Sequence, residues 1–553
     1  MYAPSGTGRT TDRTPLLKPI IASVQHSSSP SKRRRKDQKP PIPIFSIIFT
    51  LVLLGSVGFL AWDVSSYGHC YAQPLCRALQ GHRGLEQTWW RNQGPYAPFQ
   101  SLGSGGGDKG LPKGCEISQV TILHRHAARY PTEGAGKCVL SALNKIENRQ
   151  VRMPRRNPEF AFLAKTDLKL KDWKFDGLMD QGRKQSWLSG RQIKSIYKRF
   201  LSKSEGIFTR SSGGGRVVET SGYWLEGFNG GRFSLKDKSK LPKVDVVILE
   251  GEEYNNTLSV HSCPAFQNLS PKPSELMFVD LSPLLEPTLN RLNTVLKPQP
   301  ALEMDDLVCL ADMCGYDSQS KGTDWNNWSK WCGIFSKEEW EIFGHAKDLK
   351  RWYDLGETSR YGPTMGAGYV NELLARLTDY NVTDHTTTNY TLDSNENTFP
   401  QGGKLFFVDF GHDNEMLEVI SALGLLTQHR PLPTTSVPPK RTYVLSRIVP
   451  FGARMAFERV SCKMGNWEPD PEAGDGNGNE FTDKPDRGKD GKRDYIRILI
   501  NDKIESGNHP SCEFSGLLDF GLCELDAFVE SQQFAKEDVD WSICYEKGDE
   551  IAK

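Results

Sequence analysis

The chain has 553 residues, which is too long for one hydrophobic core, so we expect at least two globular units. Apolar residues make up 37% of the sequence and charged residues 25%, a mixture that excludes a wholly disordered chain. Lys and Arg together number 69 and Asp and Glu 68, so the formal net charge is only +1. Nucleic-acid-binding proteins usually carry a basic surplus, and we expect no nucleic-acid partner.

An uncharged apolar segment near the N-terminus, Ile44–Trp62, has 19 residues and can cross about 30 Å of hydrocarbon as a helix. A basic run at residues 32–36 precedes it, and positive charge beside a span stays on the cytoplasmic side. The sequence therefore predicts a single-pass type II membrane protein with a disordered basic cytoplasmic tail at 1–43, a signal-anchor at 44–62 and a lumenal or extracellular remainder. Plasma membrane, vacuole and secretory compartments all fit. A cleaved signal peptide is the main alternative, but no small-residue cleavage site follows the apolar run.

Two features downstream of this segment agree with the topology. All 12 cysteines follow it, as expected in an oxidising compartment, and their even number permits complete pairing. Sequons of the form N-x-[ST] also follow it and are candidate glycosylation sites. They are Asn255, Asn268, Asn327, Asn381 and Asn389.

The part after the membrane segment begins with a lead-in at 63–114 and continues as one domain at 115–553. Short runs rich in β-branched residues predict strands at 118–123, 244–249 and 404–410. Long segments with helical patterns separate them, which predicts an α/β sheet with helical insertions. The expected parts are an α/β core at about 115–136, 201–279 and 400–553, helical parts at about 137–200 and 280–399, and a disordered loop at 464–494.

The candidate site is the stretch 123–131, LHRHAARYP, at the carboxyl end of the first predicted strand. Ligands of open α/β sheets bind at that edge. Guanidinium groups form paired hydrogen bonds with phosphate oxygens, and a neutral imidazole beside them can attack phosphorus. Taken alone, a histidine between arginines can equally be a solvated turn.

Three motifs resolve this alternative by resemblance. Arg125-His126-x-x-Arg129-x-Pro131 resembles the RHGxRxP signature of the histidine acid phosphatases, with Ala127 at the usual glycine. Residues 208–217 resemble the second phosphate-binding arginine loop of that family, and residues 409–414 resemble its HD motif, in the same order. Further segments resemble secreted fungal phytases (3-phytase type) in particular. These are 96–99, 361–364, 371–377, 391–395 and 422–425, so the resemblance covers about Cys70 to Tyr545.

The resemblance implies a phosphoglycerate-mutase-like fold, with a mainly parallel sheet, a smaller helical insertion domain and the site between them. It implies that His126 is the nucleophile that becomes a phosphohistidine and that Asp413 protonates the leaving oxygen. The phosphoryl oxygens would be bound by Arg125, Arg129, Arg216 and His412. Because a carboxyl donates only while protonated, we expect activity below neutral pH. Because the arginines supply the positive field, we expect no metal and no other cofactor.

Two positions near the motifs have secondary roles. Arg210 is expected to support its loop rather than contact phosphate. Ala127 satisfies a position that needs only a small side chain, unless the backbone there requires positive φ.

Two features bear on the substrate. Residues 137–199 contain 16 Lys and Arg against six Asp and Glu, and in the resembled family this stretch lies over the pocket. A basic cover would attract a polyanion such as inositol hexakisphosphate, although solvated helix faces would give the same composition. Lys350 and Arg351 fall where fungal phytases place two basic substrate contacts. The alternatives are a broad-specificity acid phosphatase and a catalytically silent binding or sorting protein.

The cysteines also fit the family. The resemblance implies the pairs Cys70–Cys76, Cys115–Cys462, Cys263–Cys544, Cys314–Cys332 and Cys512–Cys523. Cys138 and Cys309 remain, and whether they form a sixth bridge is open, since sequence does not fix connectivity.

Overall fold

The computed structural model describes residues 91–546, with gaps at 104, 150–156, 165, 167, 205, 252–255, 260–261, 323–327, 387–389, 401–402, 429, 464–490 and 513–516. None of the helices in these residues is long and apolar enough to cross a membrane. The predicted tail and anchor at 1–62 lie outside the described residues and stay predictions. So do Cys70, Cys76 and the sequons Asn255, Asn327 and Asn389.

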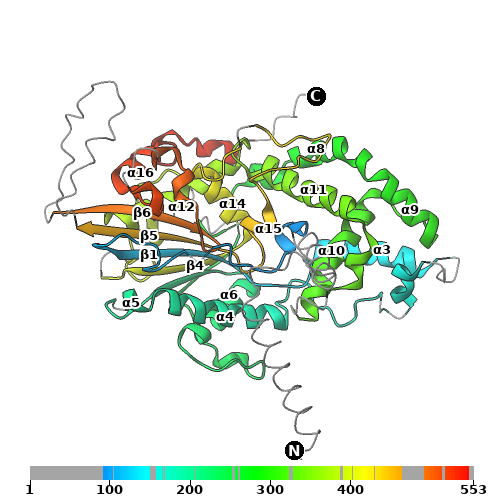
Figure 1. Cartoon of the computed structure of the whole chain (residues 1–553), viewed down its shortest axis with the longest axis horizontal. Helices are drawn as coiled ribbons and strands as arrows, with labels where there is room; N and C mark the ends of the chain where they lie inside the picture. The colour runs from blue at the N-terminus through cyan, green and yellow to red at the C-terminus, as the bar shows by residue number, and fades with distance from the viewer. Residues whose placement is uncertain are drawn as a thin grey trace, which may run out of the picture. The chain divides into compact units, whose positions relative to one another are not determined.

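Eight strands form one sheet in the order β3-β2-β4-β1-β5-β6-β7, with β8 paired to β6 (Figure 1). They are β1 (Cys115–Arg125), β2 (Phe208–Ser212), β3 (Val246–Ile248), β4 (Phe406–Gly411), β5 (Arg454–Lys463), β6 (Lys492–Ile500), β7 (Lys503–Ile504) and β8 (Cys523–Glu524). β1 to β4 pair in parallel, and every pairing that involves β5 to β8 is antiparallel. The sheet is therefore mixed, and the expectation of a mainly parallel sheet is wrong for its second half.

The expectation of a mainly parallel sheet was wrong because it depended on the strands that could be predicted from the sequence. The three predicted strands correspond to β1, β3 and β4, all in the parallel half. Antiparallel neighbours can follow one another with short connections. Asn501 and Asp502 join β6 to β7 with positive φ at both residues, as a tight hairpin turn requires. Because β6 begins at Lys492, the end of the predicted loop 464–494 is a strand.

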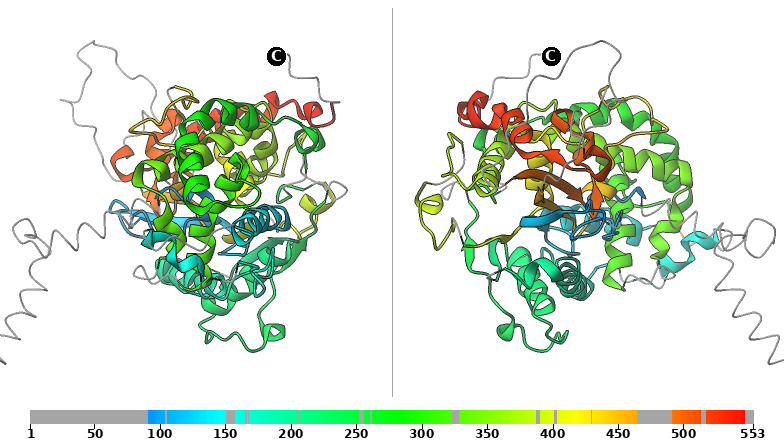
Figure 2. Two further views of the ribbon diagram at one scale, coloured as in Figure 1. Left: turned by 90° about the vertical axis from the view of Figure 1, so that its right-hand side faces the viewer. Right: turned by 60° about the vertical axis from the view of Figure 1, so that its left-hand side comes forward.

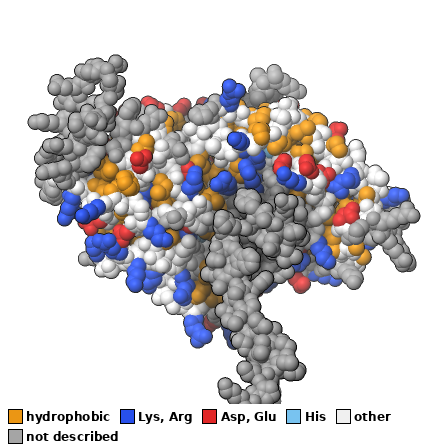
Figure 3. All heavy atoms as spheres, viewed as in Figure 1, with side chains coloured by type: hydrophobic (Ala, Val, Ile, Leu, Met, Phe, Trp, Pro, Cys, Tyr) orange, Lys and Arg blue, Asp and Glu red, His pale blue; other side chains and the backbone are white. Residues whose placement is uncertain are grey.

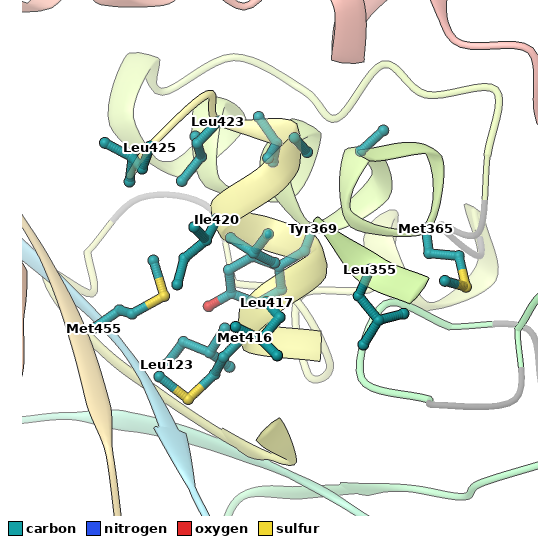
Figure 4. Packing of buried hydrophobic residues seen from close by; sticks show 14 of the residues in the cluster. Leu123, Leu355, Met365, Tyr369, Met416, Leu417, Ile420, Leu423, Leu425 and Met455 are labelled. Carbon is teal, nitrogen blue, oxygen red and sulfur yellow. The ribbon is translucent and has the colours of Figure 1, made fainter. Parts of the chain in front are cut away.

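Each face of the sheet is covered by a pair of helices (Figures 1 and 2). The helices are α4 (Asp180–Ile196), α6 (Gly215–Phe228), α12 (Gly362–Thr378) and α14 (Asp413–Ala422). Successive side chains of a strand point to opposite faces. Ile122 of β1 packs in the cluster of α4 and α6, whereas Leu123 packs in the cluster of α12 and α14. Figure 4 shows Leu123 beside Met416, Leu417 and Met455 in this second layer.

The helices α4 and α6 approach each other closely. A Cβ at Gly190 would lie 2.0 Å from the carbonyl oxygen of Trp224, and one at Gly227 would lie 1.9 Å from that of Trp187. Only glycine fits at these two contacts. Although α4 lies within the basic stretch 137–199, it therefore belongs to the layer on the sheet, where it supports the helix that carries Arg216.

A second hydrophobic cluster lies among helices outside the sheet layers. These are α3 (Glu133–Glu147), α9 (Glu286–Leu296), α10 (Met304–Ser320) and α11 (Lys337–Leu355), with α8 (Pro273–Leu281) along α11. Leu143, Leu292, Leu310 and Trp340 are buried there. The other α-helices in the described residues are α5 (Lys198–Leu201), α7 (Pro264–Asn268), α13 (Tyr390–Asp393), α15 (Leu445–Ile448) and α16 (Leu525–Ser531).

Every described cysteine is paired. The disulfides are Cys115–Cys462, Cys138–Cys309, Cys263–Cys544, Cys314–Cys332 and Cys512–Cys523. Four of them match the pairing that the resemblance implies, and the bridge between α3 and α10 joins the two cysteines that the sequence left open.

Candidate active site

The carboxyl ends of the parallel strands meet at one edge of the sheet, and the candidate site lies there. His126 follows β1, Ser212 ends β2, Glu250 follows β3 and His412 follows β4. The helices α6 and α14 also begin at this edge. Helix N-termini present unpaired N–H groups and partial positive charge, so the backbone alone already favours an anion.

His126 is fully buried with one ring nitrogen unoccupied. Its Nδ1 lies 2.9 Å from the carbonyl oxygen of Ala127. Because a carbonyl only accepts hydrogen bonds, Nδ1 carries the proton and Nε2 keeps a bare lone pair. Nε2 has no hydrogen-bond partner among the described residues. Burial, together with Arg125 and Arg129, holds the pKa of His126 well below its ordinary value, so the ring is neutral and can act as a nucleophile.

Two arginines of the same loop are fixed around this nitrogen. Arg125 donates from Nη1 to the carbonyl oxygens of Pro95 and Val449, and its guanidinium lies 4.7 Å from the ring centroid of Phe451. Arg129 donates from Nη1 to the carbonyl oxygen of Tyr130 at 3.0 Å. The Nε of each arginine is buried without a hydrogen-bond partner among the described residues. These donors are therefore available to an incoming oxyanion.

A third arginine reaches the site from α6. Arg216 Nη2 lies 3.3 Å from His412 Nδ1, and its Nη1 lies 3.6 Å from Asp176 Oδ1. On the other side of the ring, His412 Nε2 lies 2.7 Å from Glu250 Oε1. Glu250 was missed from the sequence, although a carboxylate directly after a predicted strand at the ligand-binding edge is a signal that could have found it.

Asp413 begins α14 between two guanidinium groups. Its Oδ1 lies 3.4 Å from Arg125 Nη2, and its Oδ2 lies 3.6 Å from Arg351 Nη2. Burial alone would raise the pKa of Asp413, but Arg125, Arg351 and Arg129 outweigh burial and hold it well below its ordinary value. The neighbouring cations therefore favour the ionised form of Asp413, and the expectation that it protonates the leaving oxygen stays a prediction.

Comparison with known proteins identifies the family in which this arrangement of residues occurs. The family model of the histidine phosphatase superfamily (branch 2) matches residues 116–501, more than half of the chain. The chain belongs to this family. Phytase A of Emericella nidulans is 32% identical over 508 residues, covering 90% of this chain and 99% of that protein. Phytase A of Arthroderma benhamiae is also 32% identical, covering 82% of this chain and 91% of that one.

A solved structure shows the same fold. The phytase from D. castellii has a TM-score of 0.58 at 21% identity, covering 83% of this chain and 87% of that chain. Together with the family match, these relatives establish the chain as a histidine phosphatase that hydrolyses phosphoric monoesters.

In this histidine phosphatase, the two candidate substrate contacts separate. Arg351 faces Asp413, but the adjacent Lys350 is exposed and lines another cavity, of about 520 Å³, between α8, α10 and α11. Neighbouring residues of a helix point about 100° apart, which explains the divergence. Only Arg351 of the pair is brought beside Asp413.

The basic residues of the stretch 137–199 are spread over different parts of this phosphatase. Arg183 of α4 pairs with Glu219, and Lys145 of α3 pairs with Asp306. On the face drawn in Figure 3, Lys and Arg side chains lie in several groups with Asp and Glu among them. The loop around Trp173 borders the site, since the indole lies 5.5 Å from the ring of Tyr130.

Arg210 is buried in β2. It forms buried ion pairs with Glu372 at 2.6 Å and Asp409 at 2.8 Å, which fits a supporting role. Ala127 is buried and its φ is not positive, so alanine is unstrained where the family motif has glycine. No group of three or more His, Cys, Asp or Glu side chains among the described residues could hold a metal ion.

Aromatic side chains line one side of the site, and no role there was predicted for them from the sequence. Phe451 lies under Arg125, with its ring 6.0 Å from that of His126. Tyr96 of the lead-in packs 4.8 Å from Tyr316 and 6.1 Å from Phe451. These residues are far apart in the chain, and only the fold brings them together.

Proposed function

We propose that this chain is a phytase-like histidine acid phosphatase that transfers a phosphoryl group to His126 and then to water, with inositol hexakisphosphate as a substrate. The observation that carries the proposal is the bare, buried Nε2 of His126 among Arg125, Arg129 and Arg216. A neutral nucleophile surrounded by fixed cations suits attack on an anionic phosphoryl group.

The first step forms a bond between His126 Nε2 and phosphorus, using the lone pair of that nitrogen, while the ester P–O bond breaks. The leaving oxygen takes a proton from Asp413, because an alkoxide is a poor leaving group. In the second step, water gives a proton to the Asp413 carboxylate and its oxygen attacks phosphorus. The P–N bond then breaks, and inorganic phosphate and neutral His126 are released.

The proton for the first step is supplied with the substrate. A phosphomonoester has a second pKa near 6, so at about pH 5 it binds largely as a monoanion with one P–OH proton. Its negative charge offsets the field of Arg125 and Arg129 that keeps Asp413 ionised. The proton can then pass from the phosphoryl group to Asp413, which accounts for acidic activity with a carboxyl that is ionised beforehand.

The choice of inositol hexakisphosphate is supported by the similarity to proteins named phytase A and by Arg351 at the catalytic residues. A broad-specificity acid phosphatase is the second candidate. The position of Lys350 in a separate cavity favours it, because one of the two expected substrate contacts is missing from the site.

We also propose that the domain works in a lumenal or extracellular compartment, anchored by residues 44–62. The disulfides support this, since such bridges persist mainly in oxidising compartments, and Asn268 and Asn381 are exposed sequon residues. The test is the full chain in membranes. We expect glycosidase treatment to reduce the mass of the chain, and we expect the chain to stay in the membranes during alkaline extraction. A chain that carries no glycan and is extracted by alkali would contradict the topology.

The experiment for the activity compares kcat/KM for inositol hexakisphosphate and a small phosphomonoester near pH 5, with a metal chelator present. Higher kcat/KM for the inositol phosphate supports the phytase proposal. Equal values support the broad-specificity alternative. No turnover of either ester by the folded protein would refute the proposed function.

A further inference from the structure

We propose that Glu250 is a positioning residue that fixes the tautomer of His412 and lets this histidine take up a proton when a phosphoryl group binds. The proposal rests on the proposed phosphatase function and assigns a role to a residue outside the sequence motifs.

Glu250 is held rigidly by the loop that binds the phosphoryl group. Its Oε1 accepts hydrogen bonds from the backbone N–H of Gly214 at 2.9 Å and from the Ser212 hydroxyl, as well as from His412 Nε2. Ser212 ends β2 and Gly214 directly precedes α6, the helix of Arg216. The carboxylate therefore joins three parts of the site.

These contacts determine which nitrogen of His412 carries the proton. A carboxylate only accepts hydrogen bonds, so Nε2 is protonated and Nδ1 is bare in the neutral ring. The bare Nδ1 faces Arg216 Nη2 at 3.3 Å and accepts from it. Nδ1 is thus the ring atom on the side of the phosphate-binding cations.

Binding of a phosphoryl group changes what Nδ1 faces. When Arg216 turns its N–H groups to the phosphoryl oxygens, the bare Nδ1 is left opposite an oxyanion, and two acceptors then repel each other. A proton taken up from the solvent at Nδ1 removes the repulsion and creates a charge-assisted donor. The resulting imidazolium lies between two negative groups, the phosphoryl oxygens and Glu250.

The groups that face His412 come from several elements. They are Glu250 after β3, Arg216 of α6, His126 after β1, and Asp413 and Glu415 of α14. Burial and Arg216 hold the pKa of His412 below its ordinary value, although Glu250 raises it. Burial would raise the pKa of Glu250, but His412, Ser212 and Gly214 hold it at about 2, so Glu250 stays ionised during acidic turnover.

The kinetic test uses Glu250→Gln, which keeps an acceptor oxygen for Nε2 but removes the charge. The alkaline limb of the kcat profile should move to lower pH by about one unit or more, because the imidazolium loses its counter-ion. At pH 6.5 the loss in kcat should be about 10- to 100-fold, the loss that follows when this limb moves by about one to two pH units, and it should shrink towards pH 4.5.

Asp176→Asn is the matched control. Asp176 also pairs with Arg216, at 3.6 Å, but it does not hydrogen-bond His412. This variant removes the same charge and should leave the alkaline limb in place, whatever it does to KM. A Glu250→Gln profile that is lowered equally at every pH, or unchanged, would overturn the proposal.

A second measurement needs no turnover. Nitrogen NMR of histidine-labelled full chain should show His412 neutral and protonated at Nε2 without ligand, and doubly protonated when inorganic phosphate is bound. A proton on Nδ1 without phosphate, or a neutral ring with phosphate bound, would overturn the proposal. Because this result stands even if no ester is hydrolysed, failure of the proposed function and failure of the Glu250 proposal are distinguishable.

Discussion

Arg351 lies 3.6 Å from Asp413 and, with Arg125 at 3.4 Å from the other carboxylate oxygen, encloses this carboxylate between two guanidinium groups. In the proposed mechanism, this pair links substrate binding to proton transfer. Arg351 would contact the rest of the substrate, and it also favours the ionised form of Asp413, the proposed proton carrier, before substrate binds.

Arg351→Gln should therefore change the pH dependence as well as the affinity. With one cation removed, the pKa of Asp413 rises, so Asp413 keeps the proton that it donates up to higher pH, and the alkaline limb of the kcat profile should move to higher pH by about one unit or more. Lys350→Gln removes the same charge one residue away, in a separate cavity, and should leave the limb in place. Equal shifts in both variants would show a long-range charge effect and contradict a specific contact.

The catalytic loop was predictable because it is local. Arg125, His126 and Arg129 lie within five residues at the end of a strand, so composition and position suggest an oxyanion site, and the resemblance to a family motif decides between that site and a solvated turn. Glu250 and Phe451 reach the same point only through the sheet and its connections, and neither belongs to a recognised motif. For Phe451 this long-range placement leaves no local pattern in the sequence, whereas Glu250 directly follows a predicted strand, a local signal that could have found it.

The antiparallel half of the sheet was missed for a different reason. Glu458 of β5 and Arg497 of β6 are register partners, and both are fully buried, with Nη2 2.6 Å from Oε2. The buried pair adds two charges to strands that already contain other charged residues, such as Arg459 of β5 and Asp494 of β6. Hydropathy therefore predicts that these residues are exposed, although the sheet buries them. The two charges are tolerated in the interior because they pair across the sheet.

Arg210→Met should destabilise the fold strongly. The change leaves the buried carboxylates of Asp409 and Glu372 with fewer partners, and breaking such a pair typically costs about 3–5 kcal/mol. Arg360→Met is the matched control, because the Arg360–Glu546 pair is exposed and should contribute about 1 kcal/mol or less. Urea unfolding measures both, and a similar cost for the two variants would contradict the supporting role of Arg210.

Glu418→Gln should change how stability depends on pH. Burial raises the pKa of Glu418 to about 8, from 4.5, so the folded protein retains this proton where the unfolded chain has lost it. The contribution of Glu418 to stability is therefore constant below about pH 4 and falls as pH rises towards 8.

The expected result is a stability advantage of Glu418→Gln over the parent protein that grows by up to about 5 kcal/mol between pH 4 and 8. Exposed Glu396→Gln is the control and should show no such growth. Thermal unfolding across this pH range measures the difference. A constant offset for Glu418→Gln would mean that its carboxyl is ionised in the folded protein.

Replacing Cys138 and Cys309 by serine should reduce stability by about 2–4 kcal/mol, because the bridge joins residues 171 positions apart and constrains the unfolded chain. The bridge connects α3, which begins just after the catalytic loop, to α10. Peptide mapping without reduction checks the pairing itself. Recovery of either cysteine as a free thiol from the native chain would contradict it.

The central claim, a covalent phosphohistidine at His126, is tested most directly by rapid-quench trapping with a labelled phosphomonoester at pH 5, with the quench in alkali. We predict up to one phosphoryl group per chain, located on His126 and absent from His126→Ala, which should also lose turnover. Normal turnover without trapped label, or with label on another residue, would contradict the account.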